Sequence, residues 1–176
     1  MGNNLKINTP LTDDVINNLK CRDIVYINGI IYTARDAAHK RLIEEYKKKS
    51  ILPINIKNQI IFYAGPTPNR DDEVIGSIGP TTSYRMDDYT DELLSLGLKG
   101  MIGKGNRRKE VVDSIKKYRA IYFIAYGGVS AYLAKRVVNS KMICYDDLGT
   151  EAIRELLVKD FPVIVAIDAK GNSIYD

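Results

Sequence analysis

The chain has 176 residues, of which 45% are hydrophobic and 27% charged, and its formal net charge is +4. This composition is typical of one globular domain with a buried core, and it excludes a disordered or fibrous protein. No apolar run approaches the length of a membrane span, and the first residues lack the apolar core of a secretory signal. We therefore expect a cytoplasmic protein whose small positive charge permits an anionic partner.

Short β-branched and aromatic runs alternate with helical patterns, which predicts a mixed α/β domain spanning residues 1–176 without a linker. Asn28-Gly29 is a strong hairpin signal between the first two strand candidates, because both residues tolerate positive φ. The strand candidates are residues 24–27, 30–32, 59–64, 74–78, 100–102, 121–125, 142–145 and 163–168.

Helix starts are predicted where a cap residue or a turn precedes an apolar stripe of helical period. One such stripe is Val111, Val112, Ile115 and Tyr118, and Gly97 stands where a helix should end in a left-handed cap. The predicted starts are Thr12, Asp36, Asp87, Arg107, Gly128 and Thr150.

Cys21 and Cys144 lie far apart in the sequence and match no CxxC pattern, and His39 is the only histidine. Two cysteines and one histidine cannot close a four-ligand zinc site of the Cys/His kind, so we expect no metal site in this chain. Both cysteines are expected to be reduced and partly buried. The dinucleotide and P-loop glycine fingerprints are also absent.

Residues 79–87, GPTTSYRMD, are the segment that ordinary packing explains least well. Pro80 fits the first turn of a helix, which would leave the amides of the next three residues free to attract an anion. Arg85 lies four residues after Thr81, so a helical turn would place its guanidinium on the same face as the hydroxyl. Together these groups predict a carboxylate or phosphate site; the alternative is a capped turn with Arg85 at the surface.

Two further cations follow predicted strands. Arg35 lies at a strand-to-helix junction, and His39 follows it by four residues; Lys104 stands between two glycines. The alternatives are a surface pair of Arg35 with Asp36, a packed His39 and an ordinary loop lysine. Because open α/β sheets bind ligands at the carboxyl ends of their strands, we expect these groups to converge. In contrast, we interpret the run RRK at 107–109 as a solvated face or a helix start.

Four segments together closely resemble the β subunit of the iron–sulfur class I fumarate hydratases, to which the L-tartrate dehydratase β subunit is very similar. They are TARDAAH at 33–39, GPTTSYRMD at 79–87, LGLKGMIGKG at 96–105 and DLGTEAIRELLVKDFPVIVAID at 147–168. The resemblance implies a three-layer β/β/α swivelling domain with a mixed sheet. It also implies an α-subunit partner whose cysteines hold a [4Fe–4S] cluster, ligands that this chain lacks.

The resemblance implies reversible dehydration of (S)-malate to fumarate, in which an open iron of the partner's cluster acts as a Lewis acid on the leaving hydroxyl. Fixed cations stabilise the charge that builds on a carboxylate. The catalytic base would be a threonine hydroxyl whose effective pKa neighbouring cations lower. The implied roles are Thr81 as base, Arg35, Arg85 and Lys104 as binders of the substrate carboxylates, and His39 and Thr82 as supporting residues.

Tyr84 and Tyr126 stand where the resemblance predicts smaller side chains, so L-tartrate or mesaconate remain alternative substrates. The chain is expected to be inactive alone, and the stoichiometry, for example a dimer of heterodimers, stays open. A hypothesis of another class is a stand-alone anion- or nucleotide-binding module. The twelve tyrosines form no stacking pattern typical of a single-strand binder, so neither a nucleic acid nor a membrane is an expected partner.

Overall fold

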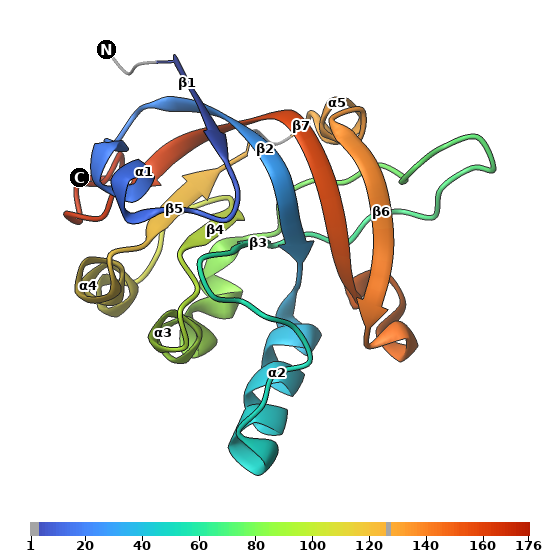
Figure 1. The fold of residues 1–176 in the computed structure, drawn as a ribbon, viewed down its shortest axis with the longest axis horizontal. Helices are drawn as coiled ribbons and strands as arrows, with labels where there is room; N and C mark the ends of the chain where they lie inside the picture. Colours follow the sequence, from blue (N-terminus) through green and yellow to red (C-terminus); the bar gives the residue numbers. More distant parts are fainter. Residues whose placement is uncertain (1–3, 126–127) are drawn as a thin grey trace.

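The computed structural model describes residues 4–125 and 128–176, which form seven strands, five α-helices and two 3₁₀ helices (Figure 1). Among these residues, no helix is long and apolar enough to cross a membrane. In chain order the elements are β1 (Asn4–Asn8), α1 (Asp13–Asn18), β2 (Ile24–Thr33), α2 (Asp36–Lys49), β3 (Ile60–Phe62), η1 (Ser83–Met86), α3 (Asp87–Ser95), β4 (Gly100–Gly103), α4 (Lys109–Tyr118), β5 (Ile121–Ile124), α5 (Ser130–Ala134), β6 (Val137–Cys144), η2 (Asp146–Glu151) and β7 (Ile153–Ile167).

The strands form one mixed sheet in the order β1-β2-β3-β4-β5-β7-β6, and β2 also pairs with β7. This second pairing closes β2, β3, β4, β5 and β7 into a five-strand barrel, with β1 and β6 as outer strands. The pairs from β1 to β5 are parallel, whereas β7 runs antiparallel to β2, β5 and β6. The expected single α/β domain with a mixed sheet is confirmed.

Two apolar cores follow from the two-residue period of the strands. Ile60 and Phe62 of β3 belong to the core inside the barrel, whereas Ile61 and Tyr63 belong to the core outside it. The outer core is covered by α2, α3 and α4, which lie on one side of the barrel in Figure 1. A register slip of one residue would exchange the two cores, so the apolar pattern fixes the strand pairing.

The predicted hairpin at Asn28-Gly29 is wrong, because β2 runs through both residues as one strand. Gly29 has φ +112°, and the pairing register with β7 shifts between Ile27 and Gly29, as at a β-bulge. A Cβ atom on Gly29 would lie 2.5 Å from Oγ1 of Thr9, which donates a hydrogen bond to the carbonyl of Ile30. The glycine therefore serves a bulge and a close approach of the chain, not a turn.

Five of the predicted helices form, three of them at the predicted start. Thr12 caps α1, Asp36 and Asp87 begin α2 and α3, and Gly97 with φ +105° follows the end of α3, all as predicted. The helices predicted at Arg107 and Gly128 begin two residues later, at Lys109 and Ser130.

Two predicted elements do not form. The strand predicted at 74–78 is irregular chain, and the helix predicted from Thr150 is replaced by the end of η2 and the start of β7. The buried residues Ile153 and Leu156 have helical spacing, but the register of β7 against β6 is irregular there. Pairing of this part of β7 with β2 and β6 overrides the local helical preference.

Candidate functional site

The carboxyl ends of β2, β3 and β4 bring the predicted site segments together. Arg35 follows β2 as the residue that precedes α2, and Lys104 follows β4. The chain at Thr81 crosses the end of β3, where its amide donates to the carbonyl of Tyr63 at 2.6 Å, and Thr82 pairs with Lys104 as a parallel bridge. Because these strands are parallel neighbours, the threonines and both cations lie at the same end of the barrel.

Arg85 joins this end through the start of α2. Its Nη1 atom lies 4.0 Å from Oδ2 of Asp36, and the side chain is 47% exposed. Arg35 does not pair with Asp36; its Nε atom lies 3.8 Å from Oε1 of Glu151. The exposed pair of Arg85 contributes little to stability, and the pair of Arg35 is long, so both guanidiniums can exchange a carboxylate of the protein for one of a ligand.

Three buried polar atoms in the first turn of α2 have no hydrogen-bond partner within the described part of the chain. They are Nε of Arg35, Oδ1 of Asp36 and Nε2 of His39. Buried polar groups are normally paired, because an unpaired group forfeits its hydration without compensation. A cluster of unpaired atoms beside the predicted cations is therefore a physical sign of a site that a ligand or a partner completes.

Two of the three amides after Pro80 that were predicted to be free are hydrogen-bonded within the chain. The amide of Thr81 donates to Tyr63 and that of Ser83 donates to the carbonyl of Lys104 at 3.0 Å. The helical turn begins at Ser83, not at Pro80, so Arg85 is not joined to Thr81 by a turn of helix. Positive charge at this end must therefore come from side chains.

Thr82, with φ -59° and ψ 120°, directly precedes η1. The methyl group of Thr82 faces Gly105, where a Cβ atom would lie 3.9 Å away. Thr82 thus packs against the loop that carries Lys104, while the role of Thr81 as base stays a prediction.

The run at 107–109 does contain a helix start, at Lys109, but Arg107 is not part of a solvated face. Its side chain is fully buried, and Nε donates to Oδ1 of Asp87 at 2.6 Å. One terminal nitrogen donates to Oγ1 of Thr90 at 2.8 Å, and the guanidinium lies 4.8–5.3 Å from the ring centres of Tyr122 and Tyr63. This buried pair joins the start of α3 to the chain that follows Lys104.

Tyr122 and Ser83 fix the loop that carries Lys104. The phenol of Tyr122 donates to the carbonyl of Gly105 at 2.7 Å and lies 2.8 Å from Oγ of Ser83. Burial raises the pKa of Tyr122, so the phenol remains a donor at neutral pH. A Cβ atom on Gly103 would meet Oγ of Ser83 at 1.8 Å, which explains the glycine before Lys104. Neither Ser83 nor Tyr122 was predicted as a site residue.

His39 is fully buried between Tyr63 and Tyr89, with ring centres 5.3 and 6.1 Å away. Its Nδ1 atom lies 2.9 Å from the carbonyl oxygen of Arg35. Because a carbonyl oxygen can only accept, Nδ1 carries the proton and donates this hydrogen bond. Burial lowers the pKa of His39 to about 4, so the ring is neutral near pH 7. His39 is therefore a packed histidine, which was one of the two alternatives expected from the sequence. Its supporting role stays a prediction, for which the unpaired Nε2 atom is available.

The pKa of His39 predicts a loss of stability in acid. The unfolded chain binds a proton near the ordinary pKa of 6.5, whereas the folded chain does so only at about 4. The contribution of neutral His39 to the free energy of unfolding is therefore fully present above pH 6.5. It is lost as the pH drops from 6.5 toward 4, by about 2–3 kcal/mol at pH 4.5. Urea unfolding of the parent chain and His39→Gln between pH 7 and 4.5 measures it; equal pH slopes would refute the assignment.

The described residues do not fit an iron–sulfur cluster. Cys21 and Cys144 are both free and half-buried, as predicted, and burial raises the pKa of Cys144 to about 11. No group of three or more His, Cys, Asp or Glu side chains within residues 4–125 and 128–176 could hold a metal ion. Tyr84 is 59% exposed beside Arg85, whereas Tyr126 lies outside the described residues.

The chain is thus an α/β barrel domain that gathers cations and unpaired polar atoms at one end. The chain belongs to the fumarase C-terminal family, because the family pattern described as Fumarase C-terminus matches residues 2–176. This confirms the resemblance found from the motifs.

Named relatives fall into two kinds. The chain is 45% identical over 174 residues to a protein of Methanocaldococcus jannaschii provisionally named L(+)-tartrate dehydratase subunit beta, covering 94% of this chain and 88% of that protein. It is 40% identical over 151 residues to the aerobic class I fumarate hydratase of Escherichia coli K12, and 39% identical over 153 residues to fumarate hydratase 2 of Leishmania major. These alignments cover 85% and 86% of this chain but only 28% and 27% of the two fumarate hydratases.

Proposed function

We propose that this chain is the β subunit of a two-chain hydro-lyase that reversibly dehydrates (S)-malate to fumarate. The observation that carries the proposal is the set of cations and unpaired polar atoms at the carboxyl ends of β2, β3 and β4. In a family named after fumarase, such an end is suited to a dianionic substrate.

Arg35, Arg85 and Lys104 bind the two carboxylates of the substrate in this proposal. Their positive charge stabilises the carboxylate next to the carbon that loses its proton. Thr81 takes that proton, and its hydroxyl needs the nearby cations to become basic enough. His39 and Thr82 support the site, His39 by packing beneath the first turn of α2 and Thr82 by pairing with the loop of Lys104.

The rest of the site belongs to a cysteine-bearing α subunit that holds a [4Fe–4S] cluster. The support is that the class I fumarate hydratases are about three and a half times as long as the matched segment, while the tartrate dehydratase relative carries the word subunit in its name. In this proposal residues 1–176 form one β module, a three-layer β/β/α swivelling domain. It is located in the cytoplasm and has no activity without its partner. A dimer of heterodimers is one arrangement of such a complex.

A second substrate, L-tartrate, is favoured by a specific observation. The relative named as a tartrate dehydratase subunit is 45% identical and has nearly the same length as this chain. The exposed Tyr84 ring beside Arg85 is a further difference from the motif, and mesaconate is a third candidate because it adds only a methyl group.

The test is anaerobic co-expression with a chain that carries three well-placed cysteines, followed by assays of malate, L-tartrate and mesaconate. We expect turnover of malate by the heteromer and none by this chain alone. Turnover of tartrate in place of malate would select the second substrate. A heteromer with a spectroscopically intact cluster that leaves all three acids unchanged would refute the proposal.

A further inference from the structure

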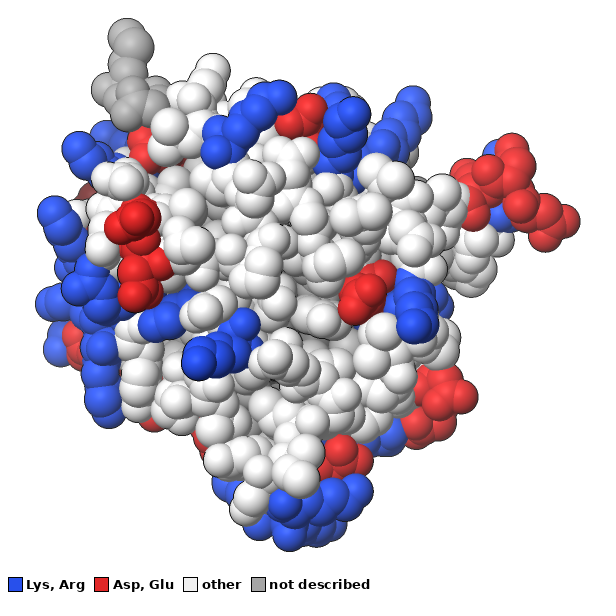
Figure 2. Space-filling model, viewed as in Figure 1, with Lys and Arg blue, Asp and Glu red and all other residues white. Residues whose placement is uncertain are grey.

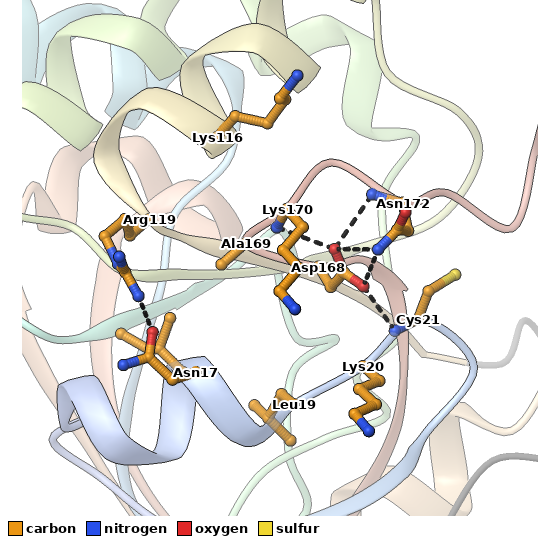
Figure 3. Close-up of a pocket in the computed structure, with 11 residues that line it drawn as sticks. Asn17, Leu19, Lys20, Cys21, Lys116, Arg119, Asp168, Ala169, Lys170 and Asn172 are labelled. Carbon is orange, nitrogen blue, oxygen red and sulfur yellow. Dashed lines mark hydrogen bonds between the residues drawn. The ribbon is translucent and has the colours of Figure 1, made fainter.

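A second concave site lies at the opposite end of the barrel from the candidate functional site. It is a cavity of about 670 Å³ between α1, the end of α4 and the turn after β7 (Figure 3). Arg119 precedes β5 and Asp168 follows β7, which is antiparallel to β5, so both lie where β4 and β5 begin. Lys104, in contrast, follows the other end of β4.

This cavity has an excess of positive charge. None of its four cations forms an ion pair within residues 4–125 and 128–176. The one acid that lines it, Asp168, is 3% exposed and accepts hydrogen bonds from the amides of Cys21, Lys170 and Asn172. Its carboxylate thus holds the turn, and its single charge is outnumbered by the four cations. The cations are Lys20, Lys116, Arg119 and Lys170.

The cations lie on different walls of the cavity. In Figure 3, Lys170 and Lys20 extend from neighbouring chain segments, and Arg119 lies across from them, bonded to the amide oxygen of Asn17. The stem of Lys116 packs beside Gly171, and its ammonium points away from the other three. Figure 2 shows Lys and Arg side chains gathered along the edge of the molecule where Figure 1 places α4 and the C-terminal turn.

Apolar side chains supply a second kind of contact. Ile16 and Leu19 line the cavity beside Ala169 while being 1% and 4% exposed. Ligand sites of about 300–1,000 Å³ typically combine an apolar lining with a few charged groups that orient the ligand. The volume exceeds the needs of a lone phosphate, and the apolar wall suits a ring.

We infer that this cavity binds a small phosphorylated compound that carries a ring, of the class of nucleoside triphosphates. The phosphates contact Lys20, Arg119 and Lys170, where the fork of Arg119 can bind two oxygens at once. The ring lies against Ala169 and the edges of Ile16 and Leu19. No residue of this site belongs to the candidate functional site, so the inference does not depend on the proposed function.

Calorimetric titration of the full chain with ATP and with tripolyphosphate tests this inference. We expect ATP to bind, and tripolyphosphate to bind more weakly because it lacks the ring. Lys20→Ala/Lys170→Ala should weaken ATP binding at least about tenfold, as loss of two charge-assisted contacts would. Arg119→Ala should weaken ATP binding by a similar factor. Because Arg119 also ends α4, the double lysine variant provides a test that does not alter the end of this helix.

The matched control is Lys48→Ala/Lys49→Ala, which removes the same charge from the far end of α2. We expect its affinity for ATP to stay within about twofold of the parent, because binding to surface charge alone is screened and unspecific. The inference is refuted if ATP does not bind or if the control loses as much affinity as the cavity variants. Equal affinity for tripolyphosphate, or tighter binding of single-stranded RNA, would equally overturn it.

Discussion

Thr81→Ala is expected to lower the kcat of the assembled heteromer about 10²–10⁴-fold, the usual contribution of a positioned general base. The substitution removes the hydroxyl proposed to take the proton. The hydrogen bond that the backbone amide of residue 81 donates to the carbonyl of Tyr63 is retained. The bridge between Thr82 and Lys104 is also retained, so the heteromer should assemble and KM should change little. The measurement is steady-state kinetics on the preferred dicarboxylate, with size-exclusion chromatography to follow assembly.

Thr82→Ala is the matched control, because it removes the same group from the adjacent residue. The methyl group of Thr82 faces Gly105, so this change should lower kcat less than about tenfold, through looser packing of the loop. Thr81→Ser keeps the hydroxyl and should keep most of the activity. Full turnover by Thr81→Ala would remove the assignment of the base, and a larger loss in Thr82→Ala would transfer it to the neighbour.

The sequence predicts the local elements of this fold well where short-range chemistry decides them. Thr12, Asp36 and Asp87 mark helix starts through their caps or acidic first turns, and Gly97 ends a helix because it reaches positive φ. The position of the candidate site follows from the same logic. Cations placed directly after parallel strands must meet at one end of the sheet.

Features that depend on pairing between distant segments were not predictable. Asn28-Gly29 has the composition of a hairpin turn, but β7 pairs along both halves of β2 and makes the dipeptide a bulge. Ile153 and Leu156 have helical spacing, but pairing with β6, and at Leu156 also with β2, holds them extended. No local sequence pattern indicates which strand will pair with which, and the β2 and β7 partners lie more than a hundred residues apart in the chain.

The candidate site shows the same division. Arg35, Arg85, Thr81 and Lys104 could be selected because each stands beside a glycine, a proline or a helix start. Two of the three free amides were a wrong inference, since the carbonyls that occupy them belong to other segments. Arg107 was missed because a run of three basic residues gives no sign that one of them is buried.

Arg107→Met is expected to reduce the free energy of unfolding by about 3–5 kcal/mol, since it leaves the buried carboxylate of Asp87 without its main partner. Arg108 cannot replace it, because its side chain is half exposed and its Nε atom lies 3.4 Å from the other carboxylate oxygen. Urea unfolding at pH 7 measures the loss. A change below about 1 kcal/mol, the size expected for an exposed pair, would show that the pair is not buried in solution.

The double variant Arg107→Met/Asp87→Asn separates the buried charge from the packing of the side chains. Asparagine keeps an oxygen for the amide of Arg108, which donates to Oδ2 of Asp87 at 3.0 Å, but it carries no charge. We therefore expect the double variant to be more stable than Arg107→Met alone, because an uncompensated buried charge is the larger cost. If both variants unfold at the same urea concentration, the lost stability belongs instead to the contacts of Arg107 with Thr90 and the two tyrosine rings. In either case the substitution loosens the joint between α3 and the loop of Lys104, so kcat of the heteromer should fall even at temperatures where the variant remains folded.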